Sequence, residues 1–155
     1  MTYTNWYPGR PEGTKQFNCG YYLYHNATHN GLADGDCTWP GPFICEDESV
    51  KKRPALPQSG YLKAPGNMGY YKKFGEAKSF HDAMKACEAD GSHLVIINNE
   101  LEARFMMALA GKGSHWVGIH DIYNEGKYVT VFSKCLTNSM VYGTQRFNAA
   151  FKNSP

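Results

Sequence analysis

The side chains best suited to chemistry in this sequence are six histidines and five cysteines. His25 and His29 could share a metal ion on a helix, but they fall in an Asn-rich stretch between predicted strands, and no third ligand follows at zinc-finger spacing. His115 and His120 lie an odd number of residues apart on a predicted strand, so we expect them on opposite faces. We find no nucleophile motif, phosphate-binding loop or pair of catalytic carboxylates. The sequence therefore does not indicate an enzyme.

The cysteines form no CxxC motif, and their number predicts two disulfides and one odd thiol. Disulfides are typical of secreted proteins, and the single Asn26-Ala27-Thr28 acceptor triplet points the same way. We therefore expect a secreted, extracellular protein. The first residues lack the zones of an export signal, which suggests that the chain does not begin where its natural parent begins.

Length and composition favour one domain of ordinary size, because the chain has 155 residues of which 42% are hydrophobic. No apolar stretch approaches the length of a membrane span. The formal net charge is +2, and basic residues are dispersed among acidic ones. Such a chain has no strong positive electrostatic field that would attract a polyanion, so we expect neither nucleic acid nor anionic lipid as a partner.

Two helices are predicted in the second half of the chain. The first is capped by Ser79 and ends at Gly91, and the second is capped by Asn99 and ends at Gly111. Their predicted apolar faces are Phe80, Ala83, Met84 and Cys87 in the first helix, and Leu101, Phe105, Ala108 and Leu109 in the second.

Short strands are predicted around these helices, at residues 18–25, 42–46, 70–74, 94–97, 115–120 and 128–132. Residues 47–67 are rich in charge, proline and glycine, which predicts an exposed linker. The tail after Ser133 loses any pattern, and we expect it to be poorly ordered. The predicted fold class is α+β.

Several segments of the second half carry a family resemblance. In order, they are residues 69–71, 80–83, Cys87, 91–98 and 115–119. Together they resemble the first half of a C-type lectin-like domain, and Trp116-Val117-Gly118-Ile119 is similar to the core tetrapeptide of that family. The amino-acid sequence of these segments is most similar to that of insect haemolymph lectins, many of which carry two such domains in tandem. Residues 1–46 resemble the second half of the same fold.

The order of the two halves is reversed relative to the family. The resemblance divides the chain into a C-terminal half of the domain at 1–46, a linker at 47–67, an N-terminal half at 68–134 and an irregular tail at 135–155. Either the chain spans the end of one domain and the start of the next, or it folds as a circular permutant. We favour closure into one domain, because the two halves supply each element of the fold once.

The resemblance also implies a disulfide pairing. Cys19 would bond to Cys37, and Cys45 to Cys87 across the linker. Cys135 has no partner in the family, so it is a free thiol, an intermolecular link or a consequence of misassigned sequence.

Sugar-binding members of the family hold calcium through a cluster of oxygen ligands. The corresponding positions here are Arg10-Pro11-Glu12, Phe17 and Leu32-Ala33-Asp34, so only Glu12 and Asp34 remain as weak calcium ligands. Arg10 would repel the ion, and Pro11 corresponds to the family's cis proline. Calcium is therefore a possible but doubtful cofactor.

The function implied by the resemblance is carbohydrate recognition by a secreted innate-immune lectin. The residues expected to bind carbohydrate are Trp6, Arg10, Glu12 and Asp34, and the expected partners are microbial or host glycans. The alternative is a lectin-like scaffold that binds protein or has lost ligand binding.

Overall fold

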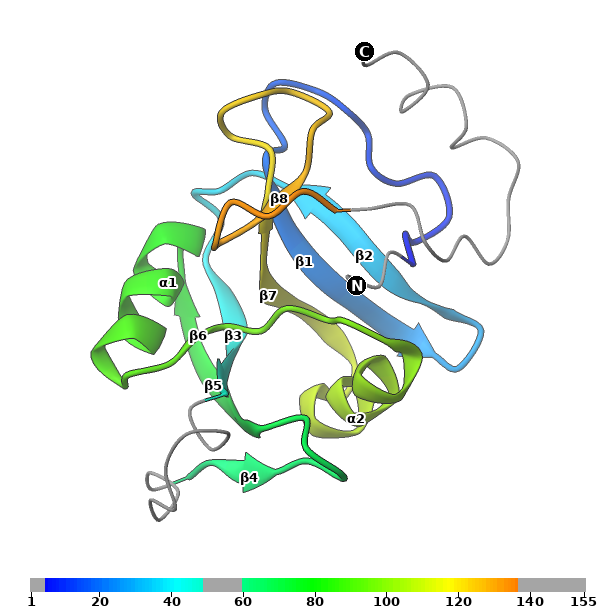
Figure 1. Cartoon of the computed structure of the whole chain (residues 1–155). Helices are drawn as coiled ribbons and strands as arrows, with labels where there is room; N and C mark the ends of the chain where they lie inside the picture. The colour runs from blue at the N-terminus through cyan, green and yellow to red at the C-terminus, as the bar shows by residue number, and fades with distance from the viewer. Residues whose placement is uncertain (1–4, 49–59, 137–155) are drawn as a thin grey trace.

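The computed structural model describes residues 5–48 and 60–136. In chain order its elements are β1 (Cys19–Asn26), β2 (His29–Gly35), β3 (Gly41–Asp47), β4 (Leu62–Lys63), β5 (Tyr70–Lys78), α1 (Phe80–Ala89), β6 (His93–Leu94), α2 (Glu100–Ala110), β7 (Gly113–His120) and β8 (Val129–Thr130). The two helices flank a mixed sheet (Figure 1). The predicted α+β class is confirmed.

The sheet interleaves strands from the two ends of the chain. Its order is β2-β1-β7-β3-β5-β4, with β6 beside β3 and β8 beside β7. Neighbouring strands are antiparallel except β3 and β7, which meet as a parallel pair at Phe43 and Trp116. Because β3 lies between β5 and β7, the first 46 residues and the second half of the chain share one sheet.

Two hydrophobic cores hold the helices to the sheet, and alternate side chains of β3 divide between them. Ile44 belongs to the core that contains Ala103 and Met106 of α2. Phe43 and Cys45 belong to the core that contains α1. β3 therefore contributes side chains to both cores.

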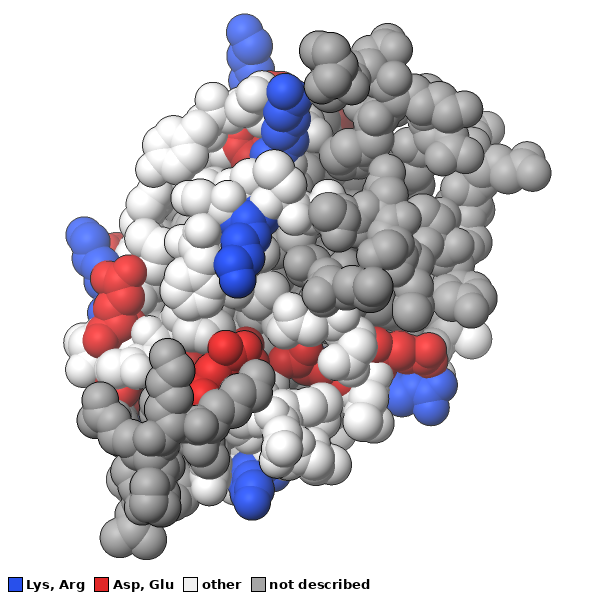
Figure 2. Space-filling model, in the orientation of Figure 1, with Lys and Arg blue, Asp and Glu red and all other residues white. Residues whose placement is uncertain are grey.

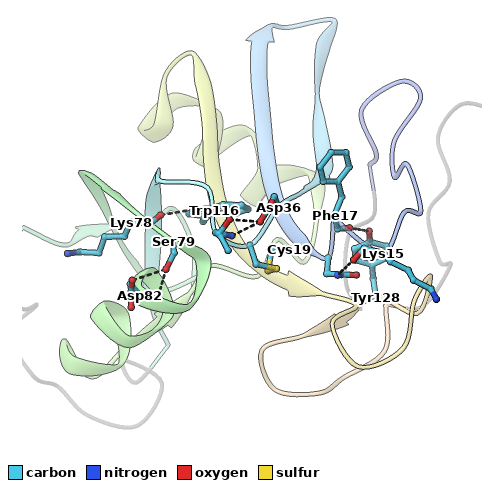
Figure 3. Close-up of a disulfide and its surroundings, with 12 residues drawn as sticks. Lys15, Phe17, Cys19, Asp36, Lys78, Ser79, Asp82, Trp116 and Tyr128 are labelled. Atoms are coloured by element: carbon cyan, nitrogen blue, oxygen red, sulfur yellow. Dashed lines mark hydrogen bonds between the residues drawn. A yellow bond between two sulfur atoms is a disulfide. The ribbon is translucent and has the colours of Figure 1, made fainter.

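The predicted caps of both helices are confirmed. Ser79 accepts a hydrogen bond from the Asp82 amide at the start of α1 (Figure 3), and Asn99 accepts one from the Glu102 amide at the start of α2. Gly111 ends α2 with a φ of 69°, a conformation that favours glycine.

The apolar face predicted for the first helix is present, since Phe80, Ala83 and Cys87 are buried. The face predicted for the second helix is wrong at Leu101 and Ala108, which are exposed. The buried side chains of α2 are instead Glu102, Ala103, Met106 and Ala110. Because the glutamate Glu102 is buried, the buried face of α2 is shifted by about one residue from the face that hydrophobicity alone predicts.

The strand predictions differ from the structure in several places. The strand predicted at 70–74 extends to Lys78, and that predicted at 128–132 is only Val129–Thr130. β2 lies in a segment expected to be loop, because its glycines and small residues hide the alternation that marks a strand. Part of the predicted exposed linker is packed, with Tyr61 and Ala64 buried and β4 between them. Only His93–Leu94 forms a strand near residues 94–97. Most of the predicted disordered tail lies outside the described residues.

Charged side chains of both signs are spread over the face shown in Figure 2, without a large region of one sign. Within residues 5–48 and 60–136, neither helix has the length and apolar content needed to cross a bilayer.

Candidate functional site

The segment before β1 runs along the outer edge of β2. The Tyr7 amide donates a hydrogen bond of 2.7 Å to the Leu32 carbonyl, and the Leu32 amide donates one of 2.6 Å to the Asn5 carbonyl. Gly31 makes this approach possible, because a Cβ at this position would lie 2.6 Å from the Tyr7 nitrogen. The edge of β2 is thus covered, and the predicted site residues of the segment are fixed against the sheet.

Three of the predicted site residues, Arg10, Glu12 and Asp34, form an ion-pair cluster around the cis peptide bond between Arg10 and Pro11. Arg10 Nη1 lies 2.6 Å from Glu12 Oε1 and 3.4 Å from Asp34 Oδ1. The other oxygen of Asp34, Oδ2, accepts hydrogen bonds from the amides of Glu12 at 2.8 Å and Gly13 at 3.3 Å. Asp34 is fully buried. The guanidinium therefore lies between the two carboxylates, in a geometry that satisfies both oxygens of Asp34.

This cluster does not fit a calcium ion. Calcium requires six to eight oxygen ligands, and the cluster offers two carboxylates that already contact a cationic side chain. An ion could reach Asp34 only by displacing Arg10 and two backbone amides. The position that the resemblance assigns to calcium is filled by a side chain of the protein.

Trp6, the fourth predicted site residue, lies apart from the ion-pair cluster. Its ring packs edge-on against Tyr128, with ring centroids 4.8 Å apart. Burial, followed by the nearby carboxylates of Asp121 and Asp34, raises the pKa of Tyr128. Trp6 also lines a cavity of about 660 Å³ between the β1–β2 turn and α2.

A second polar group lies in the core between β3, β5 and α2. The Tyr71 hydroxyl is 2.9 Å from Glu46 Oε1 and makes a very short contact with Glu102 Oε1. Glu46 Oε2 accepts from the Ile96 amide, and Glu102 Oε2 accepts from the Asn98 amide at 2.7 Å. Burial, followed by the charge of Glu102, raises the pKa of Glu46 to about 8. Glu46 is therefore protonated at neutral pH.

The sequence analysis missed this carboxyl pair. The predicted cap at Asn99 concerns only the backbone amide of Glu102, whereas the Glu102 carboxylate turns inward to Asn98 and Tyr71. The available signal was Glu46 itself, because this acidic residue directly follows the apolar run Phe43-Ile44-Cys45 within a predicted strand.

Glu46, Glu48 and His93 form a group whose potential ligand atoms lie within 4.8 Å of one another. Both Glu46 oxygens already have partners, so this acidic group is not evidence of a bound ion. His115 and His120 are buried, and burial lowers the pKa of His115 to about 4 and also lowers that of His120. Both imidazoles are therefore neutral at physiological pH, as expected of core side chains.

Comparison with known proteins places this geometry in a family. The model of the lectin C-type domain matches residues 76–153, which is half of the 155-residue chain. The chain belongs to the C-type lectin domain family. Domains of this family are carbohydrate-binding modules and typically are not enzymes.

This C-type lectin domain is similar to several curated proteins. It is 33% identical over 96 residues to the hemolymph lipopolysaccharide-binding protein of Periplaneta americana, covering 56% of this chain and 37% of that one. It is 37% identical over 92 residues to the C-type lectin domain family 3 member A homolog of Xenopus laevis, covering 54% of this chain and 48% of that protein. A third relative is the human secretory phospholipase A2 receptor, which is 26% identical over 133 residues that cover 77% of this chain and 9% of the receptor. The chain spans less than half the length of these relatives. No solved structure matches it.

The cysteines of the C-type lectin domain are paired as the resemblance implies. Cys19 bonds to Cys37, and Cys45 of β3 bonds to Cys87 of α1. Cys135 is a free, exposed thiol. Two disulfides and a hemolymph relative are consistent with an extracellular protein.

Proposed function

We propose that this C-type lectin domain recognises glycans without a divalent ion at the Arg10–Asp34 position. The observation that carries the proposal is the guanidinium of Arg10, which contacts Glu12 at 2.6 Å and Asp34 at 3.4 Å. One internal cation neutralises part of the charge of two carboxylates and ties the loop to β2, which are the structural roles of a bound ion. The Glu12 side chain, which is 40% exposed, is thus engaged by Arg10 without a divalent ion.

We further propose that the module acts in extracellular innate immunity. One relative is named as a hemolymph lipopolysaccharide-binding protein, and microbial surface polysaccharide is the corresponding ligand class for this chain. The two disulfides support an oxidising compartment.

The domain organisation is part of the proposal. We infer that residues 1–46 and 68–134 close into one permuted domain across the 47–67 linker. Support comes from β3, which pairs with β5 and β7, and from the Cys45–Cys87 bond, which joins the two halves covalently.

The test is binding of the monomeric protein to immobilised lipopolysaccharide, mannan and β-1,3-glucan, each measured in calcium and in EDTA. We expect binding to at least one polymer, with the same affinity in both buffers. Binding that disappears in EDTA contradicts the ion-free mechanism. Absence of binding to all three contradicts glycan recognition and favours the protein-binding scaffold.

A further inference from the structure

We propose that the saccharide is bound in the cavity between the β1–β2 turn and α2, and that α2 supplies part of the site. This inference rests on the proposed glycan binding and gives it a location. The cavity, called here the α2 cavity, lies between residues of the β1–β2 turn and residues of α2. Its lining includes Trp6, Tyr24 and Asn30 on one side and Arg104, Met107 and Ala108 of α2 on the other.

The size of the α2 cavity suits a small oligosaccharide. Its volume of about 660 Å³ falls within the range of roughly 300–1,000 Å³ typical of small-molecule sites. The Arg10–Glu12–Asp34 cluster, by contrast, is a set of direct contacts between side chains and amides. A sugar ring therefore has more room in the α2 cavity than at that cluster.

The lining combines the two kinds of group that a sugar ring requires. Trp6 and Tyr24 are half-buried aromatic residues that can pack on the apolar C–H face of a pyranose, and Met107 extends this wall from the helix. The rim carries the side-chain amide of Asn5, which can exchange hydrogen bonds with hydroxyl groups, and Asn30 Oδ1, which can accept one more hydrogen bond beside that from Tyr22.

The charged groups of the cavity indicate an uncharged ligand. Arg104 and Glu100 are paired on α2, so their charges cancel, and both side chains are more than half exposed. Each retains hydrogen-bonding capacity toward a hydroxyl group, because the guanidinium has five donors and the carboxylate several lone pairs. Neutral hexose units fit this pattern better than sulfated or phosphorylated ones.

The walls are held in place without a ligand. The Tyr22 hydroxyl donates to Asn30 Oδ1 at 2.7 Å, and Asn30 Nδ2 donates to the Ala27 carbonyl at 2.9 Å, which fixes the β1–β2 turn. Trp6 is fixed by its ring contact with Tyr128 and its bridge to Leu32. Such preorganisation reduces the entropic cost of binding.

The α2 cavity is distinct from the ion-pair cluster. Asn30 lies near the start of β2 and Asp34 near its end, so about 13 Å of strand separates them at roughly 3.3 Å per residue. The two locations can therefore be tested with separate substitutions.

The test uses Ala108→Trp, which places an indole in the cavity from an exposed helical position, and Arg104→Ala, which removes an exposed rim donor. Their matched controls on α1 are Ala89→Trp and Lys85→Ala, both at exposed positions. Binding to mannan, β-1,3-glucan and lipopolysaccharide is measured for each variant after its fold is verified by circular dichroism.

We expect Ala108→Trp to weaken binding by about tenfold or more and Arg104→Ala by about three- to tenfold, with both controls unchanged. We also expect added salt to leave the affinity unchanged, since the ligand is neutral. If the wild type binds and both cavity variants bind equally well, the α2 cavity is not the site, although glycan recognition stands. Salt-sensitive binding contradicts a neutral ligand. If the wild type binds no polymer, the proposed function and this inference are both wrong.

Discussion

Replacing Glu46 with glutamine tests the account of the buried carboxyl pair. The Tyr71 hydroxyl has one proton, yet its oxygen lies close to oxygens of Glu46, Glu102 and Met68. Protonated Glu46 can donate to the Tyr71 oxygen, which leaves the single Tyr71 proton for the short contact with Glu102 Oε1. A glutamine amide at position 46 can donate in the same way at every pH.

The sign of the pH effect follows from the direction of the shift. The pKa of Glu46 is raised by burial from 4.5 to about 8, so between these values the folded protein holds a proton that the unfolded chain has lost. The contribution of Glu46 to the stability of the wild type is therefore greatest below about pH 4.5, and it is lost as the pH rises through about 8. At about 1.4 kcal/mol per pKa unit, the free energy of unfolding that the wild type loses between these pH values is at most about 5 kcal/mol. We expect a loss of roughly 2–4 kcal/mol, because the site relaxes when Glu46 ionises.

The assay is urea unfolding of wild type, Glu46→Gln and the exposed control Glu88→Gln, at about pH 5 and about pH 9, with EDTA present. Glu46→Gln should match the wild type at the lower pH and exceed it by roughly 2–4 kcal/mol at the higher pH, whereas Glu88→Gln should follow the wild type. If Glu46→Gln and the wild type lose the same stability between the two values, Glu46 is ionised in the fold and the proton arrangement is wrong.

Four further results are expected. Replacing Cys45 and Cys87 together with serine should cost about 4 kcal/mol, because their bond closes a 42-residue separation, and unchanged urea stability would show that the halves do not depend on it. Gly118→Ala should cost roughly 1–3 kcal/mol, since its Cβ would lie 2.5 Å from the Leu94 carbonyl oxygen; an unchanged melting temperature would contradict this packing. Burial lowers the pKa of His115 from 6.5 to about 4, so acidification across that window should cost up to about 3 kcal/mol, and His115→Phe should abolish this loss. Arg10→Ala should lower stability by about 1–3 kcal/mol and permit weak calcium binding by calorimetry; a variant as stable as the wild type would show that the guanidinium is dispensable.

Much of the fold could be predicted because local rules and the final packing agree. Ser79 and Asn99 cap helices in the sequence and in the structure, and their side chains accept the expected amides. The strand around Trp116 follows from its apolar run. β2 could not be recognised, because a segment with two glycines, an alanine, an asparagine and an aspartate among its seven residues has low strand propensity and is stabilised by pairing with β1.

The candidate site was predictable in part. The segment that contains Arg10 and Glu12, and the buried partner Asp34, were identified, but their mutual ion pairing depends on side-chain directions that the sequence does not specify. The α2 cavity could not be predicted, because it is formed between segments about 80 residues apart, including Thr28 and Ala108. The orientation of α2 depends on the partners of Glu102, which belong to β5 and to the loop before the helix.

The most direct test of ion-free glycan recognition is a two-dimensional NMR titration of the nitrogen-labelled protein with soluble mannan in EDTA, followed with soluble β-1,3-glucan. The chain has three indole N–H groups, from Trp6 in the α2 cavity and from Trp39 and Trp116 elsewhere. Ion-free binding of a neutral glycan in the α2 cavity predicts that one of these polymers shifts the Trp6 signal, that the signals of Trp39 and Trp116 stay in place, and that calcium added afterwards changes nothing. A Trp6 signal that stays fixed with both polymers, or that moves only after calcium is added, would contradict it.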